Sequence, residues 1–572
     1  MNDRAQQLHN LRHSAAHLLA HAVLELYPET ILTIGPVTDE GFFYDFLPTT
    51  TFKDEDLKKI EDKMHEIAQR NLPITQTEMS KEDAIKLFAN NPYKFELITN
   101  IPDTMVGISR QGSFADLCRG GHVAHTGEIK HFKLLATSGS YWRADRSNQA
   151  LQRISGTAFL TAEDLAEFEK LKEEALLYDH RKLGRQMDLF SISDFAPGFP
   201  FFHPKGRAVL NTMIAFMRDL QQKHHYQEVS TPVMLNDELW KTSGHYYFYK
   251  DNMYFAEVEG TSFAVKPMNC PGSILIFNSR PRSYRELPFR MSEFGNVVRH
   301  ELSGVLHGLL RVRGFTQDDA HTYCSEAQLD DELLLIINII KTLFARFGVD
   351  STMKFAIATR PAKSIGTDRQ WEMGTEALKK ALDACGQPYT IKEGEGAFYG
   401  PKIEVGMQDS MKRSWQCSTV QVDFALPERF DVAFINTKGE REQPIMIHQA
   451  LYGSMERFFG ILIEHYKGAF PFWLAPVQVR ILPITDAQKE YAQEIYELLR
   501  TNGFRTEIDN SGDPLSGQIK SAQGERVPLM IVIGKKEVEA RTLTIRHRDG
   551  GAQESGITLD TIVPMLQKLA AQ

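Results

Sequence analysis

Residues 289–319 read FRMSEFGNVVRHELSGVLHGLLRVRGFTQDD, and two strand-forming runs in them flank a loop that glycine punctuates at 303–308. Similar short runs, broken by Gly, Pro and Asn and followed by helical stretches, continue through residues 182–470. Strands grouped in this way, with helices appended, predict an α+β domain built on an antiparallel sheet.

The whole chain is long enough for several domains. It has 572 residues, of which 42% are hydrophobic and 24% charged. At roughly 100–200 residues per domain, it has room for three or four. The net charge of −9 argues against a general nucleic-acid coat, but it allows RNA binding at a local basic patch.

The five cysteines are too few for a disulfide framework and favour a reducing compartment. No run of about 18 apolar residues predicts a membrane span, and the first ten residues lack the apolar core of a signal peptide. We therefore expect a cytoplasmic protein that does not contact membranes.

Three further segments complete the predicted organisation. Residues 1–160 mix amphipathic helices, at 12–27 and 52–69, with a β-rich end, which predicts an α+β domain. Residues 161–181 predict a charged linker helix. Residues 471–572 alternate strand and helix patterns, which predicts a small, mostly parallel α/β domain.

Two pairs of metal-ligating residues lie in the first domain. His13 and His17 share a helix face at a spacing of i, i+4, and Cys118 and His122 have the same spacing around an Arg-Gly-Gly turn. They predict either a polar hydrolytic pocket or a zinc site, and the alternative is ordinary packing of histidines. The glutamate of HExxH is absent, which argues against a metalloprotease.

Arginines around the 289–319 segment suit a phosphate. Arg299 and Glu301 flank its loop, Arg311 follows it, and Arg457 follows Gly453 where a helix begins. A guanidinium can bind a phosphate through two parallel hydrogen bonds. Neither the phosphate-binding GxxxxGK[ST] loop nor the dinucleotide-binding GxGxxG motif is present, so any nucleotide site must be of another type.

These motifs resemble a known family. FRMSEFGNVVRHE with RVRGFTQDDAH resembles motif 2 of class II aminoacyl-tRNA synthetases, GSMERFFGILIEHY with Arg457 resembles motif 3, and EVSTPVM with Pro232 resembles motif 1. KPMNCPG, DDAHTYC, EGAFYGPKIE, CSTVQVDF and MIHQALYGSMERF together resemble threonyl-tRNA synthetases, and RHSAAH and CRGGH resemble their editing domain. The resemblance spans nearly the whole chain, although the family's usual small extreme amino-terminal domain is not in this sequence.

The resemblance implies three domains: an editing domain at 1–160, an antiparallel-sheet catalytic core at 182–470 and an anticodon-binding domain at 471–572. It also implies a zinc ion held by Cys270, His321 and His448, with a fourth position open to the amino and hydroxyl groups of threonine. A metal that requires a hydroxyl rejects valine, which an apolar pocket does poorly. Serine keeps the hydroxyl, so a second hydrolytic site is needed.

The resemblance also implies roles in the nucleotide site. Arg299, Arg311 and Arg457 would bind ATP, with Mg²⁺ on its phosphates, and Glu301 would lie near the adenine. The amino-acid and adenylate site would be lined by Gln317, Asp319, Tyr399, Lys402 and Gln421. In that set Asp319 suits the ammonium group and Lys402 a phosphate, and His245 would assist transfer to the tRNA.

Two RNA sites follow from the same resemblance. The editing pocket, where water attacks mischarged seryl-tRNA(Thr), would consist of His13, His17, Lys94, Asp116, Cys118 and His122. Glu537 and Arg546 would contact anticodon bases. The implied protein is a homodimeric ligase that takes ATP, L-threonine and tRNA(Thr).

Three alternatives remain at this point. A synthetase-derived RNA-binding protein would lack ligase activity, and a stand-alone hydrolase would use only the first domain. A related class II enzyme specific for serine or proline would lack the zinc residues.

Overall fold

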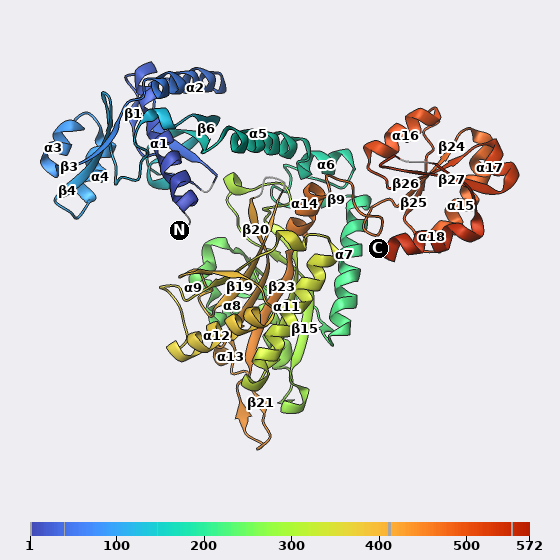
Figure 1. Cartoon of the computed structure of the whole chain (residues 1–572). Coiled ribbons are helices and arrows are strands. Elements are labelled where there is room, and N and C mark those ends of the chain that lie inside the picture. Colours follow the sequence, from blue (N-terminus) through green and yellow to red (C-terminus); the bar gives the residue numbers. More distant parts are fainter. Residues whose placement is uncertain (1–2, 39, 146, 410–412, 551–552, 572) are drawn as a thin grey trace. The chain divides into compact units, whose positions relative to one another are not determined.

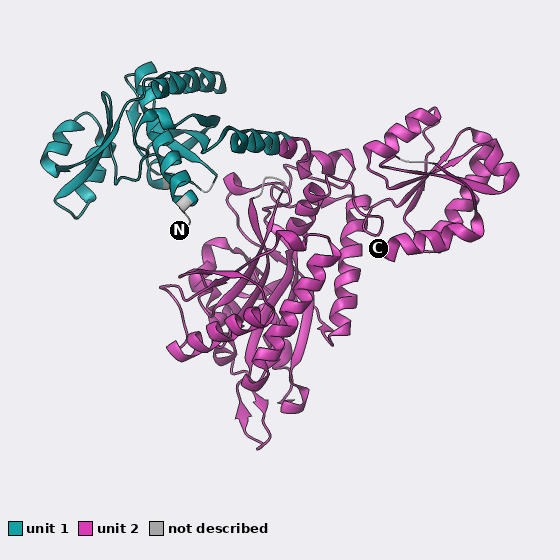
Figure 2. Ribbon diagram, in the orientation of Figure 1, with its two compact units in different colours: residues 1–173 teal, residues 174–572 magenta. Residues whose placement is uncertain are grey.

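The computed structural model describes residues 3–38, 40–145, 147–409, 413–550 and 553–571. They form two compact units, residues 1–173 and 174–572, and the division falls within helix α5 (Ala162–Leu177) (Figure 2). Thr161 caps this helix by accepting a hydrogen bond from the Asp164 amide at 3.1 Å, as its capping pattern predicts.

The described part of unit 1 combines two antiparallel sheets with helices α1 to α4 and the first part of α5 (Figure 1). The larger sheet has the order β1-β2-β7-β6, and α1 and α2 pack against it. These elements are α1 Asp3–Leu26, β1 Ile31–Leu32, β2 Phe42–Leu47, α2 Asp54–Gln69, β6 His131–Tyr141 and β7 Ala150–Phe159. The smaller sheet and its helices are β3 Ile74–Ser80, α3 Lys81–Leu87, α4 Pro92–Asn100, β4 Met105–Gln111 and β5 Phe114–Leu117. Helix α1 begins nine residues before the predicted Arg12, because the polar residues ahead of it continue the helix.

Unit 2 is centred on an eight-stranded sheet of order β10-β15-β16-β23-β20-β19-β17-β18. Its inner pairs, from β15 to β17, are all antiparallel, as predicted, and the two edge pairs are parallel. The strands are β10 Gln227–Glu228, β15 Phe289–Val298, β16 Gly314–Cys324, β17 Lys354–Ala358, β18 Tyr389–Lys392, β19 Lys402–Gln408, β20 Ser414–Asp423 and β23 Ile445–Ser454.

One face of this sheet is covered by helices. The buried side chains of Ile403, Val420 and Ile447 join one hydrophobic core with those of α11 and α12. Because side chains alternate along a strand, the next residue of each strand faces the opposite side. The helices of this part of unit 2 are α6 His180–Gln186, α7 Pro204–Lys223, α10 Cys270–Phe277, α11 Leu329–Arg346, α12 Asp368–Ala384, α13 Ala425–Arg429 and α14 Met455–His465.

Smaller elements surround the large sheet. A three-stranded sheet, with α8 and α9 beside it, lies in the segment that carries His245. These elements are β8 Phe190–Ser191, β9 Phe201–Phe202, β11 Met234–Asn236, α8 Asp237–Ser243, α9 His245–Tyr249, β12 Tyr254–Val258, β13 Thr261–Val265, β14 Arg282–Ser283, β21 Phe434–Ile435 and β22 Arg441–Glu442.

The carboxyl-terminal part of unit 2 has a mixed sheet of order β25-β24-β26-β27-β28. The prediction of a mostly parallel sheet is wrong, since only the two pairs made by β24 are parallel. Parallel neighbours need a crossover of about a dozen residues or more, and the chain between β26 and β27 is shorter than that. The elements are β24 Val479–Pro483, α15 Lys489–Thr501, β25 Thr506–Ile508, α16 Leu515–Gly524, β26 Leu529–Ile533, α17 Lys535–Ala540, β27 Thr542–His547, β28 Glu554–Thr558 and α18 Leu559–Ala571.

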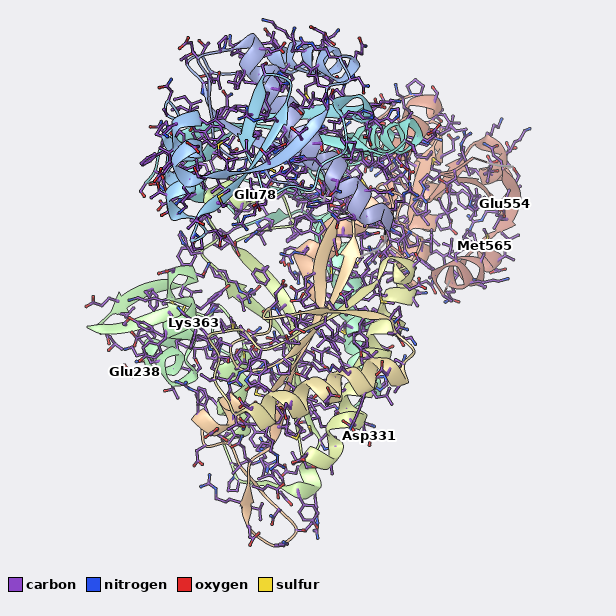
Figure 3. All side chains as sticks on the ribbon, turned by 60° about the vertical axis from the view of Figure 1, so that its left-hand side comes forward. Glu78, Glu238, Asp331, Lys363, Glu554 and Met565 are labelled. Atoms are coloured by element: carbon purple, nitrogen blue, oxygen red, sulfur yellow. The ribbon has the colours of Figure 1, made fainter. Side chains whose placement is uncertain are left out.

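Charged side chains lie on the surface of both units. Glu78 and Glu238 are exposed and lie on the outside of the ribbon (Figure 3). Among the described residues, no helix has both the length and the apolar character needed to cross a bilayer.

Candidate active site

The pairing of four strands brings predicted site residues into one row across the large sheet. His321 on β16 pairs with His448 on β23, His448 pairs with Gln421 on β20, and Gln421 pairs with Lys402 on β19. Directly paired residues share a face, so all four side chains lie on the side opposite the helical core. Gln317 and Asp319 precede His321 at even spacing on the same strand and face the same side.

This row forms the floor of a pocket of about 430 Å³. The lining includes these predicted residues: Cys270, Arg299, Glu301, Arg311, Gln317, Asp319, Tyr399, Lys402, Gln421, His448 and Arg457. His321 lies beneath the lining, and His245 lies behind it, in ring contact with Phe398 and Tyr399.

Cys270, His321 and His448 place one ligand atom each within 4.8 Å of one another. Cys270 comes from the start of α10, which passes over the sheet. Nε2 of His321 is buried without a hydrogen-bond partner among the described residues. A thiol and two imidazoles are the donors that zinc prefers, so this set fits a zinc ion.

Asp423 orients His448. The Asp423 carboxylate lies 2.8 Å from Nε2 of His448 and also accepts the amide hydrogens of Ala425 and Leu426. Burial lowers the pKa of His448, but Asp423 and Cys270 outweigh burial and raise it to about 10. A carboxylate on the far nitrogen of a histidine is typical of metal sites, because it fixes the ring and leaves the other nitrogen for the ion.

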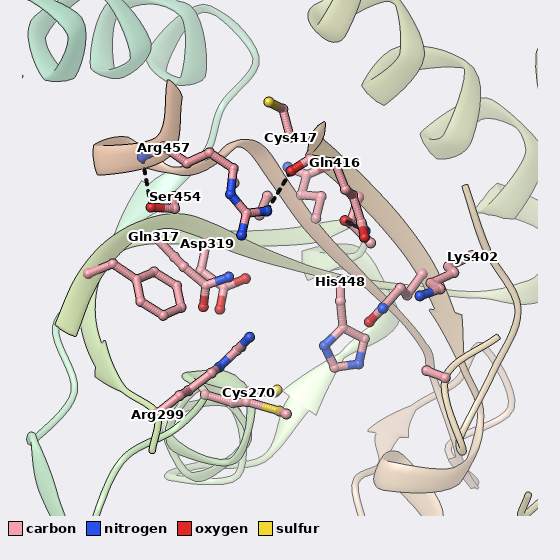
Figure 4. A pocket seen from close by; sticks show the side chains of 18 of the residues that line it. Cys270, Arg299, Gln317, Asp319, Lys402, Gln416, Cys417, His448, Ser454 and Arg457 are labelled. Carbon is pink, nitrogen blue, oxygen red and sulfur yellow. Dashed lines mark hydrogen bonds between the residues drawn. The ribbon is translucent and has the colours of Figure 1, made fainter. Parts of the chain in front are cut away.

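Two arginines reach into the pocket from opposite sides (Figure 4). Arg457 is held by the carbonyl oxygens of Leu310 and Gln416, both at 2.9 Å, and Arg299 by the carbonyl of Pro267 at 3.1 Å. The Arg299 guanidinium lies 5.1 Å from the centre of the Phe315 ring. Both guanidinium groups are therefore held in place by the protein, as binding of a charged ligand requires.

Three pairs of polar side chains complete the walls. Arg311 donates to Glu301 at 3.0 Å, and Tyr399 donates to Gln421 at 2.6 Å. Lys402 lies 2.6 Å from a Glu404 carboxylate oxygen. Two of these pairs, Arg311 with Glu301 and Tyr399 with Gln421, thus join predicted residues to each other.

Asp319 and His245 are both buried. Asn269 donates to Asp319 at 3.0 Å, and burial raises the pKa of Asp319 to about 6. Burial lowers the pKa of His245 to about 3, so this imidazole is neutral, and its Nδ1 lies 2.8 Å from the Ser243 hydroxyl.

A second site lies in unit 1, in a cavity of about 480 Å³. Helix α1 presents His13 and His17 from one face, and Cys118 follows β5. The Cys118 sulfur lies 3.5 Å from Nε2 of His13 and 3.1 Å from Nε2 of His122. The structure therefore brings together the two predicted pairs, although His122 itself does not line the cavity.

Beside this cluster, Asp116 is the centre of a buried polar group. It lies 3.3 Å from Nδ1 of His17, forms an ion pair with Lys94 and accepts a hydrogen bond from the Tyr44 hydroxyl at 2.7 Å. Burial lowers the pKa of His17 to about 3 and that of His122 to about 4. Both imidazoles are therefore neutral near pH 7.

Several residues in these sites were absent from the sequence prediction. Asp423, Asn269 and Phe315 belong to the first site, and Tyr44 and Ser14 belong to the second. For Asp423 a signal exists, since it alternates with Gln421 on the same strand. Tyr44 is 72 residues from its partner Asp116, and no spacing rule connects them.

Comparisons with known proteins agree with this geometry. Residues 254–466 match the tRNA synthetase class II core domain (G, H, P, S and T). Residues 478–569 match an anticodon binding domain, and residues 106–155 match the second additional domain of threonyl and alanyl tRNA synthetases. The threonine–tRNA ligase of Clostridium tetani (strain Massachusetts / E88) is 49% identical over 544 residues, which cover 95% of this chain and 85% of that protein. A Clostridium botulinum (strain Langeland) threonine–tRNA ligase matches with the same identity and coverage.

The chain belongs to the threonine–tRNA ligase family. This confirms the family, the class II core and the ligase activity predicted from the motifs. The roles of single residues stay predictions.

Solved structures of the threonine–tRNA ligase family share the fold. The RNA binding domain of threonyl-tRNA synthetase from Cryptosporidium parvum Iowa II is 38% identical with a TM-score of 0.66, over 68% of this chain and 98% of that chain. Putative threonyl-tRNA synthetase ThrRS-1 from Aeropyrum pernix is 30% identical with a TM-score of 0.60, over 69% and 97%. A prolyl-tRNA synthetase from Cryptosporidium parvum, at 17% identity and a TM-score of 0.53 over 68% and 75%, shares the fold alone.

The predicted anticodon residues of this threonine–tRNA ligase family member lie in the carboxyl-terminal sheet region. Glu537 accepts the Gly534 amide at 2.9 Å and the Thr544 hydroxyl at 2.9 Å, so it also holds the start of α17. Arg546 lies on β27, paired with Met530 on β26. Their contact with anticodon bases stays a prediction.

Proposed function

We propose that this chain joins L-threonine to tRNA(Thr) in two steps at the unit 2 pocket. Threonine and ATP form threonyl-adenylate and pyrophosphate, and the threonyl group then passes to the terminal ribose of the tRNA. The observation that carries the proposal is the row across the sheet, where His448, Gln421 and Lys402 line the same pocket as Arg299 and Arg457 and His321 pairs with His448 on the same face.

Threonine would bind over the cysteine and the two histidines. Cys270, His321 and His448 would hold a zinc ion, which would supply a Lewis acid for the amino and hydroxyl groups of the amino acid. Asp319, held by Asn269, supplies a carboxylate for the ammonium group. The Tyr399 hydroxyl and Gln421 form the wall beside His448.

ATP would bind between the two arginines. Arg457 and Arg299 would bind its phosphates and neutralise charge as the carboxylate of threonine attacks the α-phosphate. The Phe315 ring behind Arg299 and the Glu301–Arg311 pair at the rim suit the adenine end. Mg²⁺ would accompany the ATP phosphates, since it binds through phosphate oxygens and few protein ligands.

Transfer to tRNA would use groups at the edge of the same pocket. His245 is neutral and lies behind Tyr399, where it could accept or relay the proton of the ribose hydroxyl. Lys402 and Gln317 would orient the adenylate during attack. On the carboxyl-terminal domain, Glu537 and Arg546 would contact the anticodon bases of the tRNA.

The unit 1 cavity would hydrolyse seryl-tRNA(Thr). An imidazole of His13, His17 or His122 would position the attacking water and take its proton during attack, and the Lys94–Asp116 pair fixes charge beside them. A hydroxyl-requiring metal cannot reject serine, which differs from threonine by one methyl group worth roughly 1–3 kcal/mol. This selectivity gap is the reason for a separate editing pocket.

The protein would work as a cytoplasmic homodimer. β10, which precedes Pro232, is the terminal strand of the large sheet, and edge strands are suited to association around a two-fold axis. All five cysteines are free thiols, which suits a reducing compartment. Light scattering on the purified chain tests the dimer.

Amino-acid-dependent ATP–pyrophosphate exchange tests the activation step. On zinc-loaded protein we expect exchange with threonine, weaker exchange with serine and almost none with valine or proline. Equal exchange with threonine and valine would refute the zinc filter. No exchange with any of the four would refute the proposed chemistry of the pocket.

A further inference from the structure

His180 is a fully buried histidine that no step of the proposed reaction uses. It is the first residue of α6, directly after the segment that leads out of α5. Helix α6 packs against α14, the helix that carries Arg457 (Figure 1).

Each ring nitrogen of His180 forms a hydrogen bond, and the donor and the acceptor of each can be assigned. The amide N–H of Leu309 points at Nε2 over 3.0 Å, and since a backbone amide can only donate, Nε2 must carry a lone pair. Nδ1 therefore carries the proton and donates to a Glu464 carboxylate oxygen at 2.8 Å. The histidine is thus a single neutral tautomer that bridges a loop amide and a helix carboxylate.

The two partners of His180 belong to the walls of the nucleotide pocket. Leu309 precedes Leu310, whose carbonyl holds the guanidinium of Arg457 at 2.9 Å, and Arg311 comes next. Glu464 follows Arg457 by two helical turns on α14, so both point to the same side of that helix. The loop is consequently attached to α14 at two points, through Arg457 and through His180.

The packing around His180 leaves no freedom for this attachment. A Cβ atom on Gly308 would lie 2.1 Å from Nε2 of His180, and Gly308 has φ +50°, which favours glycine. A Cβ atom on Gly460 of α14 would lie 3.2 Å from Cβ of Leu309 and 3.0 Å from Cδ2 of Leu310. Small residues are thus needed on both sides of the loop.

A metal site is the competing interpretation. Asp179, His180 and Glu464 each place one ligand atom within 4.8 Å of the others. The lone pair of Nε2 already accepts from Leu309, and Nδ1 carries a proton, so the ring has no lone pair left for an ion. The hydrogen-bonding role uses both nitrogens, and we favour it for that reason.

We propose that His180 is a positioning residue of the nucleotide site, which holds the loop of Leu309 to Arg311 against α14 and so sets the distance between Arg311 and Arg457. The proposal rests on the proposed function, because it assigns ATP to these arginines. His180 itself touches no substrate.

The test compares three variants by threonine-dependent pyrophosphate exchange on the zinc-loaded full chain. His180→Phe keeps the ring volume but neither hydrogen bond, and we expect the KM for ATP to rise roughly tenfold while the KM for threonine changes less than about twofold. His180→Gln keeps one donor and one acceptor at similar spacing and should restore the KM for ATP to within about threefold of the unchanged protein. Gly308→Ala pushes on the same ring atom and should raise the KM for ATP as His180→Phe does.

Tyr466→Phe is the matched control. The Tyr466 hydroxyl at the carboxyl end of α14 donates to the carbonyl of Phe347 and does not contact the loop. This variant also loses one hydrogen bond at α14. If its KM for ATP also rises while its KM for threonine does not, any lost contact with α14 has the same effect, and the proposal is overturned. Equal rises in both KM values for His180→Phe, or identical kinetics for Phe, Gln and His, would also overturn it.

Hydrogen exchange supplies a readout that does not depend on activity. Peptides that contain Leu309 should exchange faster in His180→Phe and stay protected in His180→Gln and Tyr466→Phe. Unchanged protection in His180→Phe would overturn the proposal. If the unchanged protein shows no threonine-dependent exchange, the proposed function fails, and the deuterium result alone decides whether His180 holds the loop.

Discussion

At the scale of single residues, the strongest expectation concerns Cys270. Cys270→Ser replaces the only thiol of the cluster with a hydroxyl, a much poorer donor for zinc, while the two histidines remain. We expect dialysed protein to lose its zinc and threonine-dependent pyrophosphate exchange to fall by at least about 100-fold. Atomic absorption and the exchange assay measure the two effects on the same sample.

Cys324→Ser provides the control. Cys324 is equally buried on β16 but lies outside the ligand cluster. Zinc content should not change in it. Full activity of Cys270→Ser without zinc would remove the metal from the mechanism.

A second residue-scale prediction concerns Asp423. Asp423→Asn keeps the shape of the side chain but loses the charge that pairs with His448. Zinc affinity should weaken by about 10–100-fold, because such partners fix the ligand ring and raise its basicity. Competition with a chelator measures this affinity. An unchanged value would mean that Asp423 serves only to accept the hydrogen bonds from the α13 amides of Ala425 and Leu426.

Residue identities in the two sites were only partly predictable. The motif resemblance suggested the zinc ligands and the arginines. That these side chains come close together depends on pairing between strands far apart in the sequence, such as that of His321 with His448. Supporting residues such as Asn269 and Tyr44 were missed, because a hydrogen bond between distant side chains leaves no periodic trace in the sequence.

At the scale of secondary-structure elements, helix α1 should make unit 1 sensitive to acid. Burial lowers the pKa of His17 to about 3 and of His122 to about 4, while an unfolded histidine titrates near 6.5. As the pH falls below about 6.5, the unfolded chain takes up protons that the folded unit refuses, so stability is lost. At about pH 5 the loss is about 2 kcal/mol for His17 and less for the partly exposed His122.

Pulse proteolysis in urea can measure this effect on the full chain, if the band that contains residues 1–173 is followed at about pH 7.5 and about pH 5. His17→Gln stays neutral at both pH values, so it should lose about 2 kcal/mol of the pH dependence. An equal pH dependence in the two proteins would contradict the pKa assigned to His17.

Local sequence patterns predict where a helix begins better than they predict the direction of a strand. The amino-terminal cap at Thr161 can be predicted from the sequence, because it is formed by residues three apart. The predicted parallel direction of β27 is wrong, because alternating strand and helix patterns lead to parallel strands only where the connection is long enough for a crossover. The stretch between β26 and β27 is too short to return to the starting edge of the sheet, and strand β27 therefore runs antiparallel.

At the scale of the whole molecule, the two pockets lie in different compact units, the one proposed for synthesis in residues 174–572 and the one proposed for editing in residues 1–173. Sites with no shared side chains are expected to respond independently to mutation. The division of labour therefore predicts that the two activities can be separated.

Changing both His13 and His17 to Ala tests that separation. The double variant removes two of the three imidazoles of the His13, His17, Cys118 and His122 cluster and leaves every residue of the unit 2 pocket intact. We expect threonylation within about twofold of the unchanged protein and accumulation of seryl-tRNA(Thr) when serine is supplied. His65→Ala, on α2 against Phe132, is the control that changes a histidine of unit 1 outside the cavity, and it should accumulate no seryl-tRNA. If the double variant also accumulates no seryl-tRNA(Thr), there are two explanations. Either serine is never activated, which pyrophosphate exchange with serine tests, or another group in the cavity is the base.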